Sequence, residues 1–231
     1  MERITTFNDF LNEGRSKWDS LASKLTRNVF KTWVKGYEGG MKEINYMEQV
    51  EDKLEFDLDA TLYIDKKFKG FDVLDGTGAD ARDEDDDGDF QTPFINIHFG
   101  INPEWLPGEL SEVYFHLADV MRHEMEHITQ DGKDTGNYRM GKPNEDDSEL
   151  RAYIEMGLLP KAQYMMLPKE VDANLQGLRY ESKKRKEAMS DAVNRYLNTQ
   201  EQSGVIDGTE REDILTLWRR RAKQIGGIPK F

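Results

Sequence analysis

The sequence predicts an α+β fold, in which a small mixed β-sheet packs on a central helix and the C-terminal half is mainly helical. Apolar and charged residues alternate with the period of a strand in residues 51–65, and residues 93–99 place Ile95, Ile97 and Phe99 on one side of a second expected strand. From residue 111 onward, apolar residues recur at helical spacing instead. We therefore expect a single domain over residues 14–231, with a helical C-terminal part from about residue 168.

Charge and cysteine content restrict the possible partners and ligands. The 231 residues include 32 Lys or Arg and 45 Asp or Glu, a net charge of −13, which argues against nucleic acid as the main partner because phosphate binding needs a cationic surface. Cysteine is absent, so any metal ion must be held by His, Asp or Glu. With no run of about 18 apolar residues and no secretory signal, we expect no membrane partner and no secretion.

The N-terminal quarter of the chain is expected to contain two helical segments followed by the first strands. Met1–Glu13 is a short amphipathic segment, and Ser16–Lys35 carries a longer apolar stripe that ends at Gly36 and Gly39–Gly40. Residues 51–65 then change period and are expected to form one or two strands.

The middle of the chain begins with an acidic segment. Residues 80–89 hold seven acids and one arginine, which predicts a solvated loop. The alternatives are a calcium site, because the spacing matches the first half of a calcium-binding loop, and attraction of a basic substrate. A strand is expected at Pro93–Phe99. The helices expected after it are Ser111–Gln130, Ser148–Met156, Pro168–Leu197 and Thr209–Ile225.

The expected helix at 111–130 contains the sequence His123-Glu124-Met125-Glu126-His127. Residues i and i+4 lie on one face of a helix, so the imidazoles of His123 and His127 can reach the same ion. A carboxylate directly after the first histidine projects beside the metal and can deprotonate a bound water. The motif therefore predicts a metal site rather than two unrelated surface histidines.

This H-E-x-x-H helix resembles that of the zincin metallopeptidases. The resemblance implies a zincin-like fold with zinc (Zn2+) as the cofactor, His123 and His127 as zinc ligands and Glu124 as the general base. It also implies hydrolysis of a protein or peptide substrate, with endopeptidase activity favoured. If that fold holds, an extended substrate would pair with Pro93–Phe99 as an edge strand; a plain internal strand is the alternative.

A catalytic zinc usually has three protein ligands, and without cysteine a downstream carboxylate is the natural third one. Glu149 and Glu170 compete for this role, because each opens an expected helix and is followed three positions later by alanine. The surroundings of Glu170 resemble those in compact phage and bacterial zincins, whereas the spacing of Glu149 is closer to the thermolysin-like branch. We expect Glu170 to be the ligand, with Glu149 as the alternative.

Supporting groups are less well defined by the sequence. Asp119 and Asp131 each lie four residues from a histidine of the motif and could accept its free N–H, although ordinary helix-face charge is the simpler interpretation. Peptide hydrolysis also needs a group that stabilises the oxyanion. The candidates that the sequence leaves open are His98, Tyr138, Tyr153 and Tyr164.

The N-terminal stretch Phe7–Gly14 resembles the capsid-targeting peptides of large contractile-tailed bacteriophages, which end in Leu/Ile-x-Glu, here Leu11-Asn12-Glu13. The resemblance implies removal of residues 1–13 by a prohead protease, contact with the capsid scaffold, and a location in the host cytoplasm or the capsid interior. An ordinary first helix docked on the core is the alternative. The alternative to a peptidase is a non-catalytic, metal-binding phage internal or structural protein.

Overall fold

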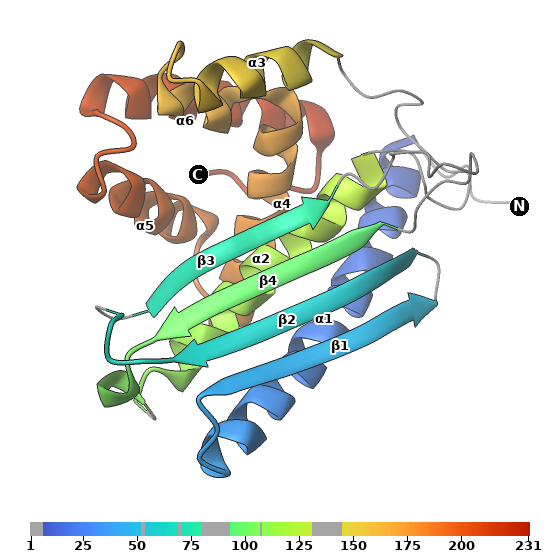
Figure 1. Ribbon diagram of the computed structural model, residues 1–231. Coiled ribbons are helices and arrows are strands. Elements are labelled where there is room, and N and C mark those ends of the chain that lie inside the picture. The colour runs from blue at the N-terminus through green and yellow to red at the C-terminus, as the bar shows by residue number, and fades with distance from the viewer. Residues whose placement is uncertain (1–6, 52–53, 69–70, 80–92, 107, 131–144) are drawn as a thin grey trace, which may run out of the picture. The chain divides into compact units, whose positions relative to one another are not determined.

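A computed structural model describes residues 7–51, 54–68, 71–79, 93–106, 108–130 and 145–231 (Figure 1). It has an α+β architecture, as the sequence predicts. The chain divides into two compact units, one made of residues 21–142 and the other of residues 1–20 together with 143–231. None of the helices in the described part of the chain combines the length and apolar composition needed to cross a membrane.

The unit of residues 21–142 is built on a four-stranded mixed sheet with the order β1-β2-β4-β3 (Figure 1). The strands are β1 (Glu43–Glu51), β2 (Glu55–Ile64), β3 (Phe71–Ala79) and β4 (Phe94–Ile101). β2 is antiparallel to β1 and parallel to β4, and β3 is antiparallel to β4. The strands expected at 51–65 and 93–99 are confirmed as β2 and β4, whereas β1 and β3 were not predicted.

The sheet position of β4 corrects the expectation for Pro93–Phe99. β4 pairs with β2 on one side and with β3 on the other, so it is an internal strand and cannot accept an additional strand. Pro93 directly precedes the strand, where its missing N–H does not interrupt a ladder. Its carbonyl accepts a hydrogen bond from the backbone N–H of Asp57 (2.8 Å), which continues the pairing with β2 by one residue.

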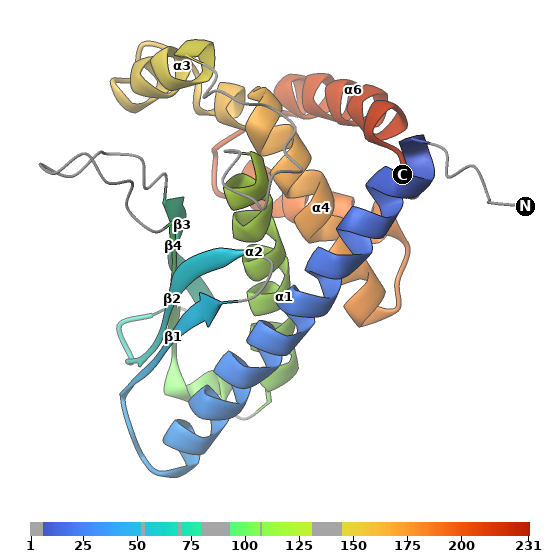
Figure 2. The ribbon, with the colours of Figure 1, turned by 90° about the vertical axis from the view of Figure 1, so that its right-hand side faces the viewer.

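Helices α1 (Phe7–Glu38), from residue 21 onward, and α2 (Leu110–Gln130) both cover the same face of this sheet (Figure 2). Trp33 of α1 joins the two layers, because its indole N–H donates to the carbonyl of Ala60 on β2 (3.2 Å) and its ring contacts Phe99 of β4. α2 lies against β3 and β4. The apolar positions of β2 and β4 that face these helices are buried, and they alternate with more exposed positions that face the other way.

The N-terminal part of the chain is one continuous helix rather than the two segments that the sequence predicts. α1 passes through Gly14 and continues past Gly36 to Glu38. Gly36 permits close packing rather than ending the helix, because a Cβ atom there would lie 2.7 Å from the Ile44 side chain. The helix ends at Glu38, and the chain turns at Gly40, which has a positive φ of 79°; the N–H groups of Gly40 and Met41 bond back to the carbonyls of Tyr37 and Gly36.

The second unit contains the helices α3 (Glu145–Glu155), α4 (Pro168–Arg185), α5 (Met189–Gln202) and α6 (Gly208–Ile225), with a short 3-10 helix η2 (Lys161–Met166). α5 and α6 pack on α4 around a core that includes Leu175, Leu178, Val193, Leu197 and Trp218. The indole N–H of Trp218 donates to the carbonyl of Met165 (2.9 Å), which fastens η2 to this core.

The helix expected over Pro168–Leu197 is two helices. Lys186 adopts a left-handed conformation with φ 59°, and the N–H of Glu187 bonds back to the carbonyl of Ser182 (3.1 Å). This reversal lets the buried side chains of α5 pack against α4 instead of extending beyond it, and the burial of apolar surface favours the turn despite the strained backbone. The predicted last helix is confirmed as α6, which ends at Gly226.

α4 is the central helix of this unit, and it is buried at every residue from Glu170 to Ser182. Its buried charges are paired. Arg179 binds the carboxylate of Asp19 on α1 through both terminal nitrogens, and Arg221 of α6 binds both oxygens of Asp172 at 2.6 Å. Such bidentate pairs fix geometry as well as neutralising charge. The Arg221–Asp172 pair lies two residues from Glu170 and ties this end of α4 to α6.

Candidate metal centre

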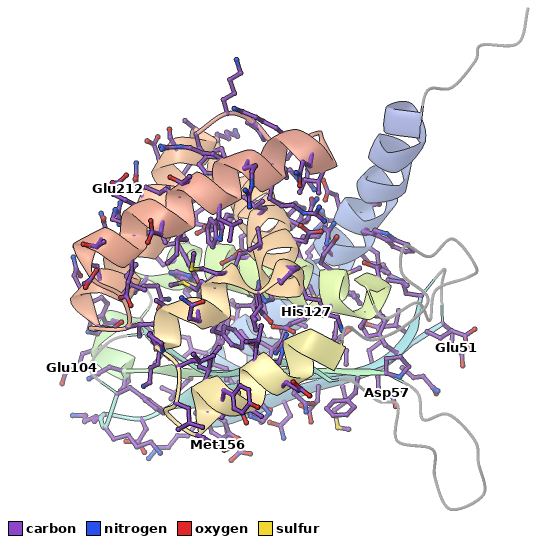
Figure 3. All side chains as sticks on the ribbon, turned by 90° about the horizontal axis from the view of Figure 1, so that it is seen from above. Glu51, Asp57, Glu104, His127, Met156 and Glu212 are labelled. Carbon is purple, nitrogen blue, oxygen red and sulfur yellow. The ribbon has the colours of Figure 1, made fainter. Side chains whose placement is uncertain are left out.

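The helix that carries the H-E-x-x-H motif is held in place by an apolar face. Val113, Leu117, Met121, Met125 and Ile128 recur at spacings of three or four residues along α2, and each is at most 3 % exposed. This periodicity forms one stripe on the helix, which packs against the sheet. His123 and His127 stand on an adjoining face and are half-buried. His127 lies near the C-terminal end of α2 (Figure 3).

The two histidines converge on one point. The Nε2 atoms of His123 and His127 are 3.1 Å apart, and their rings meet edge to face with centroids 4.8 Å apart. With Zn–N bonds of about 2.0–2.1 Å and a tetrahedral angle, two nitrogens on one zinc ion are separated by about 3.3 Å. The observed separation is close to this value, so one ion can bind both rings with little movement of either side chain.

Glu124 and Glu126 have different surroundings on the same helix. Glu126 is 1 % exposed and receives a hydrogen bond of 2.9 Å from Arg122, which is itself fully buried, so this carboxylate is committed to an ion pair one turn away. Glu124 is 4 % exposed and directly follows His123. The Arg122–Glu126 pair was not predicted, although its i, i+4 spacing on an expected helix was the signal that could have found it.

His123, His127 and Glu170 form a group that could hold a metal ion, since each offers one ligand atom and these atoms lie within 4.8 Å of one another. The set of two imidazoles and one carboxylate matches the donors found at catalytic zinc sites. Glu149, the alternative third ligand, is not part of this group and is exposed on α3.

The local sequence places Glu170 at the start of a helix. Pro168 occupies the first position of α4, where its missing N–H is not needed, and Glu170 follows in the first turn. A carboxylate at this end of a helix is stabilised by the helix dipole. Glu170 is 1 % exposed, and its Oε1 accepts a hydrogen bond of 2.5 Å from Nη2 of Arg151 on α3.

Arg151 also contacts Tyr164 of η2. Its Nη1 donates to the Tyr164 hydroxyl (3.1 Å), and its guanidinium carbon lies 5.1 Å from the centre of the ring. Burial by itself would lower the pKa of Arg151, but the charges of Glu170 and Tyr164 and the hydrogen bonds to both residues together outweigh it, so the pKa is raised. Burial, and then the charge of Glu170, raise the pKa of Tyr164. Arg151 is therefore charged and Tyr164 protonated at neutral pH.

The remaining candidates are placed as follows. His98 lies beside Tyr63 with ring centroids 6.1 Å apart, and it alternates along β4 with the buried residues Ile97 and Phe99, so it is on the opposite face of the sheet from them. Tyr153 is exposed on α3, and Tyr164 binds Arg151. Asp119 is half-buried one turn before His123 on α2. Tyr138, Asp131 and the acidic segment 80–89 lie outside the described residues.

Comparison with protein-family models, with curated proteins and with solved structures finds no match to this chain.

Proposed function

We propose that the protein is a zinc-dependent peptidase that cleaves peptide bonds with a metal-activated water. The observation that carries the proposal is the convergence of the His123 and His127 Nε2 atoms, 3.1 Å apart, in a group with Glu170 that could hold a metal ion. The adjoining Glu124 provides a nearly buried carboxylate immediately after the first of these histidines. These four side chains correspond to three metal ligands and one general base, which metal-assisted hydrolysis can use.

Each of these residues has a separate role in the proposed reaction. His123, His127 and Glu170 would hold the ion and leave a position for water, and zinc when bound would lower the pKa of that water toward neutrality. Glu124 accepts the proton of the water as it attacks the scissile carbonyl, and then delivers it to the leaving amine. No covalent intermediate with the chain is needed, because water is the nucleophile.

The donor set favours zinc over calcium and magnesium. Calcium and magnesium prefer six or more oxygen ligands, whereas this group offers two imidazole nitrogens and one carboxylate. Imidazole ligands suit zinc, and a three-ligand set leaves the open position that catalytic zinc requires. The substrate we propose is a protein or peptide segment.

The capsid-targeting leader remains a separate proposal. Leu11 and Glu13 lie within α1, so the Glu13–Gly14 bond is in a helical segment. A protease that binds its substrate in extended form could cut there only after this turn of helix has unwound. Mature protein starting at Gly14 would support both removal of the leader and the proposed capsid partners.

Chelation provides the test of the peptidase proposal. Purified protein is expected to hydrolyse an unstructured protein substrate, to lose this activity when a chelator removes its metal, and to regain it when one equivalent of zinc is returned. Cleavage is followed by mass spectrometry of the products. Activity that survives complete metal removal would contradict the proposal. Stoichiometric zinc without cleavage of any substrate in a mixed peptide library would instead support the non-catalytic alternative.

A further inference from the structure

Arg151 forms a bridge among three elements of the second unit. From α3 it donates one hydrogen bond to Glu170 Oε1 on α4 (2.5 Å) and another to the hydroxyl of Tyr164 on η2 (3.1 Å). The guanidinium also lies over the Tyr164 ring. The planar guanidinium has several N–H donors in fixed directions and can make these contacts at the same time, whereas a lysine ammonium has no such plane to lie over the ring.

Glu170 needs a partner of this kind because its side chain is buried. The carboxylate is 1 % exposed, while the side chain of Arg151 is 32 % exposed. A buried carboxylate without hydrogen bonds is strongly disfavoured, and a charge-assisted bond from arginine both stabilises the charge and fixes the orientation of the group. Tyr164 in turn restricts the guanidinium, so the position of the Glu170 carboxylate follows from packing on α3 and η2.

We propose that Arg151 is the positioning residue that presents Glu170 to the metal ion, an inference that rests on the proposed function. A carboxylate has two oxygens, so it can accept a hydrogen bond from arginine through one and bind a cation through the other. Partners of this type fix the orientation of metal ligands, and their removal typically weakens metal binding by about 10–100-fold.

The positive charge of Arg151 has an opposing effect on metal binding, because a guanidinium repels a divalent cation. Arg151 is one-third exposed, so solvent screens its charge, whereas the hydrogen bond that it makes to the buried carboxylate is shielded from water. Loss of orientation therefore outweighs relief of repulsion. Removing Arg151 should weaken metal binding rather than strengthen it.

The test is a zinc-affinity measurement on the full-length chain, by competition with a chromophoric chelator, for the wild type and four variants. Arg151→Ala is expected to bind zinc about 10–100-fold more weakly. Arg151→Lys should recover only part of the lost zinc affinity, since an ammonium keeps the positive charge but lacks the planar arrangement of N–H donors. Tyr164→Phe should cause a smaller loss than Arg151→Ala. Arg220→Ala, which removes an exposed arginine of α6, is the matched control and should bind as the wild type does.

Cobalt substitution separates positioning from a general loss of stability. At saturating cobalt the visible spectrum of Arg151→Ala is expected to differ from that of the wild type, because the carboxylate ligand is oriented differently, while Arg220→Ala should match the wild type. If Arg151→Ala does not fold, Arg151→Lys takes its place, and an unchanged affinity in that variant overturns the inference.

Two failures are distinguishable. A wild-type protein that binds no metal would overturn the peptidase proposal and this inference with it. A wild-type protein that binds zinc and cleaves substrate, while Arg151→Ala binds zinc equally well or more tightly, would overturn the inference and leave the peptidase proposal intact.

Discussion

Replacing Glu124 by glutamine is expected to reduce peptide hydrolysis by about 10²–10⁴-fold while the protein keeps its metal. Glutamine has nearly the same shape as glutamate, so the packing around this buried position should be preserved. Its amide cannot accept the proton of the attacking water, and this loss acts on the chemical step. Initial cleavage rates at saturating substrate, together with zinc content, measure the two effects separately.

The control for this change is Glu109→Gln, which makes the same chemical substitution in the residue just before α2. It should leave both the rate and the zinc content unchanged. A Glu124→Gln variant that cleaves as fast as the wild type would show that Glu124 is not the general base. A variant that loses both zinc and activity would show that Glu124 contributes to metal binding instead.

Removal of the Glu170 carboxylate should weaken metal binding by more than the roughly 10–100-fold typical of changes outside the ligand set. Glu170→Ala removes the only carboxylate in the group with His123 and His127 among the residues that the structure describes. Glu149→Ala is the matched comparison, because it makes the same substitution at the exposed alternative on α3 and should retain zinc. Zinc affinity of the two variants is measured under identical conditions.

Glu170→Ala also leaves Arg151 without its carboxylate partner, which can destabilise the fold. Glu170→Gln separates these effects, because its amide oxygen can still accept a hydrogen bond from Arg151 while the negative charge is lost. It should remain folded and bind zinc more weakly than the wild type. Wild-type affinity in both Glu170 variants, with loss of zinc in Glu149→Ala, would transfer the third-ligand role to Glu149.

The helix of the candidate site could be predicted from the sequence because its signals agree. The apolar periodicity from Val113 to Ile128 and the H-E-x-x-H motif both require a helix, and the observed α2 differs from the expected span by one residue at its start. β2 and β4 were also predictable, because apolar residues alternate with polar ones along them and their buried positions follow that alternation.

Other elements depend on contacts that a local pattern does not contain. Gly36 looked like a helix end, but it allows β1 to approach α1 at Ile44, a residue eight positions further along the chain. β1 exposes alternate positions, including the apolar residue Met47. Its pairing with β2, rather than its own composition, is what identifies it as a strand. The break between α4 and α5 occurs at Lys186, a residue type that carries no turn signal.

The role inferred for Arg151 was not predictable for a similar reason. Its partner Glu170 lies 19 residues away, on another helix, and nothing in the spacing of the two links them. Glu170 itself was expected as a ligand from the residues around it. Glu149, the alternative ligand, differs from it mainly in being exposed. The fold supplies this distinction because it shows which acid is buried and which faces solvent.

The central claim is that His123 and His127, with a carboxylate, hold one zinc ion. Elemental analysis of the purified chain tests it most directly, with His123→Ala prepared in parallel. We predict one equivalent of zinc per wild-type chain and much less than one in His123→Ala. A wild-type chain without a stoichiometric transition metal, or equal zinc in the two proteins, would contradict the account.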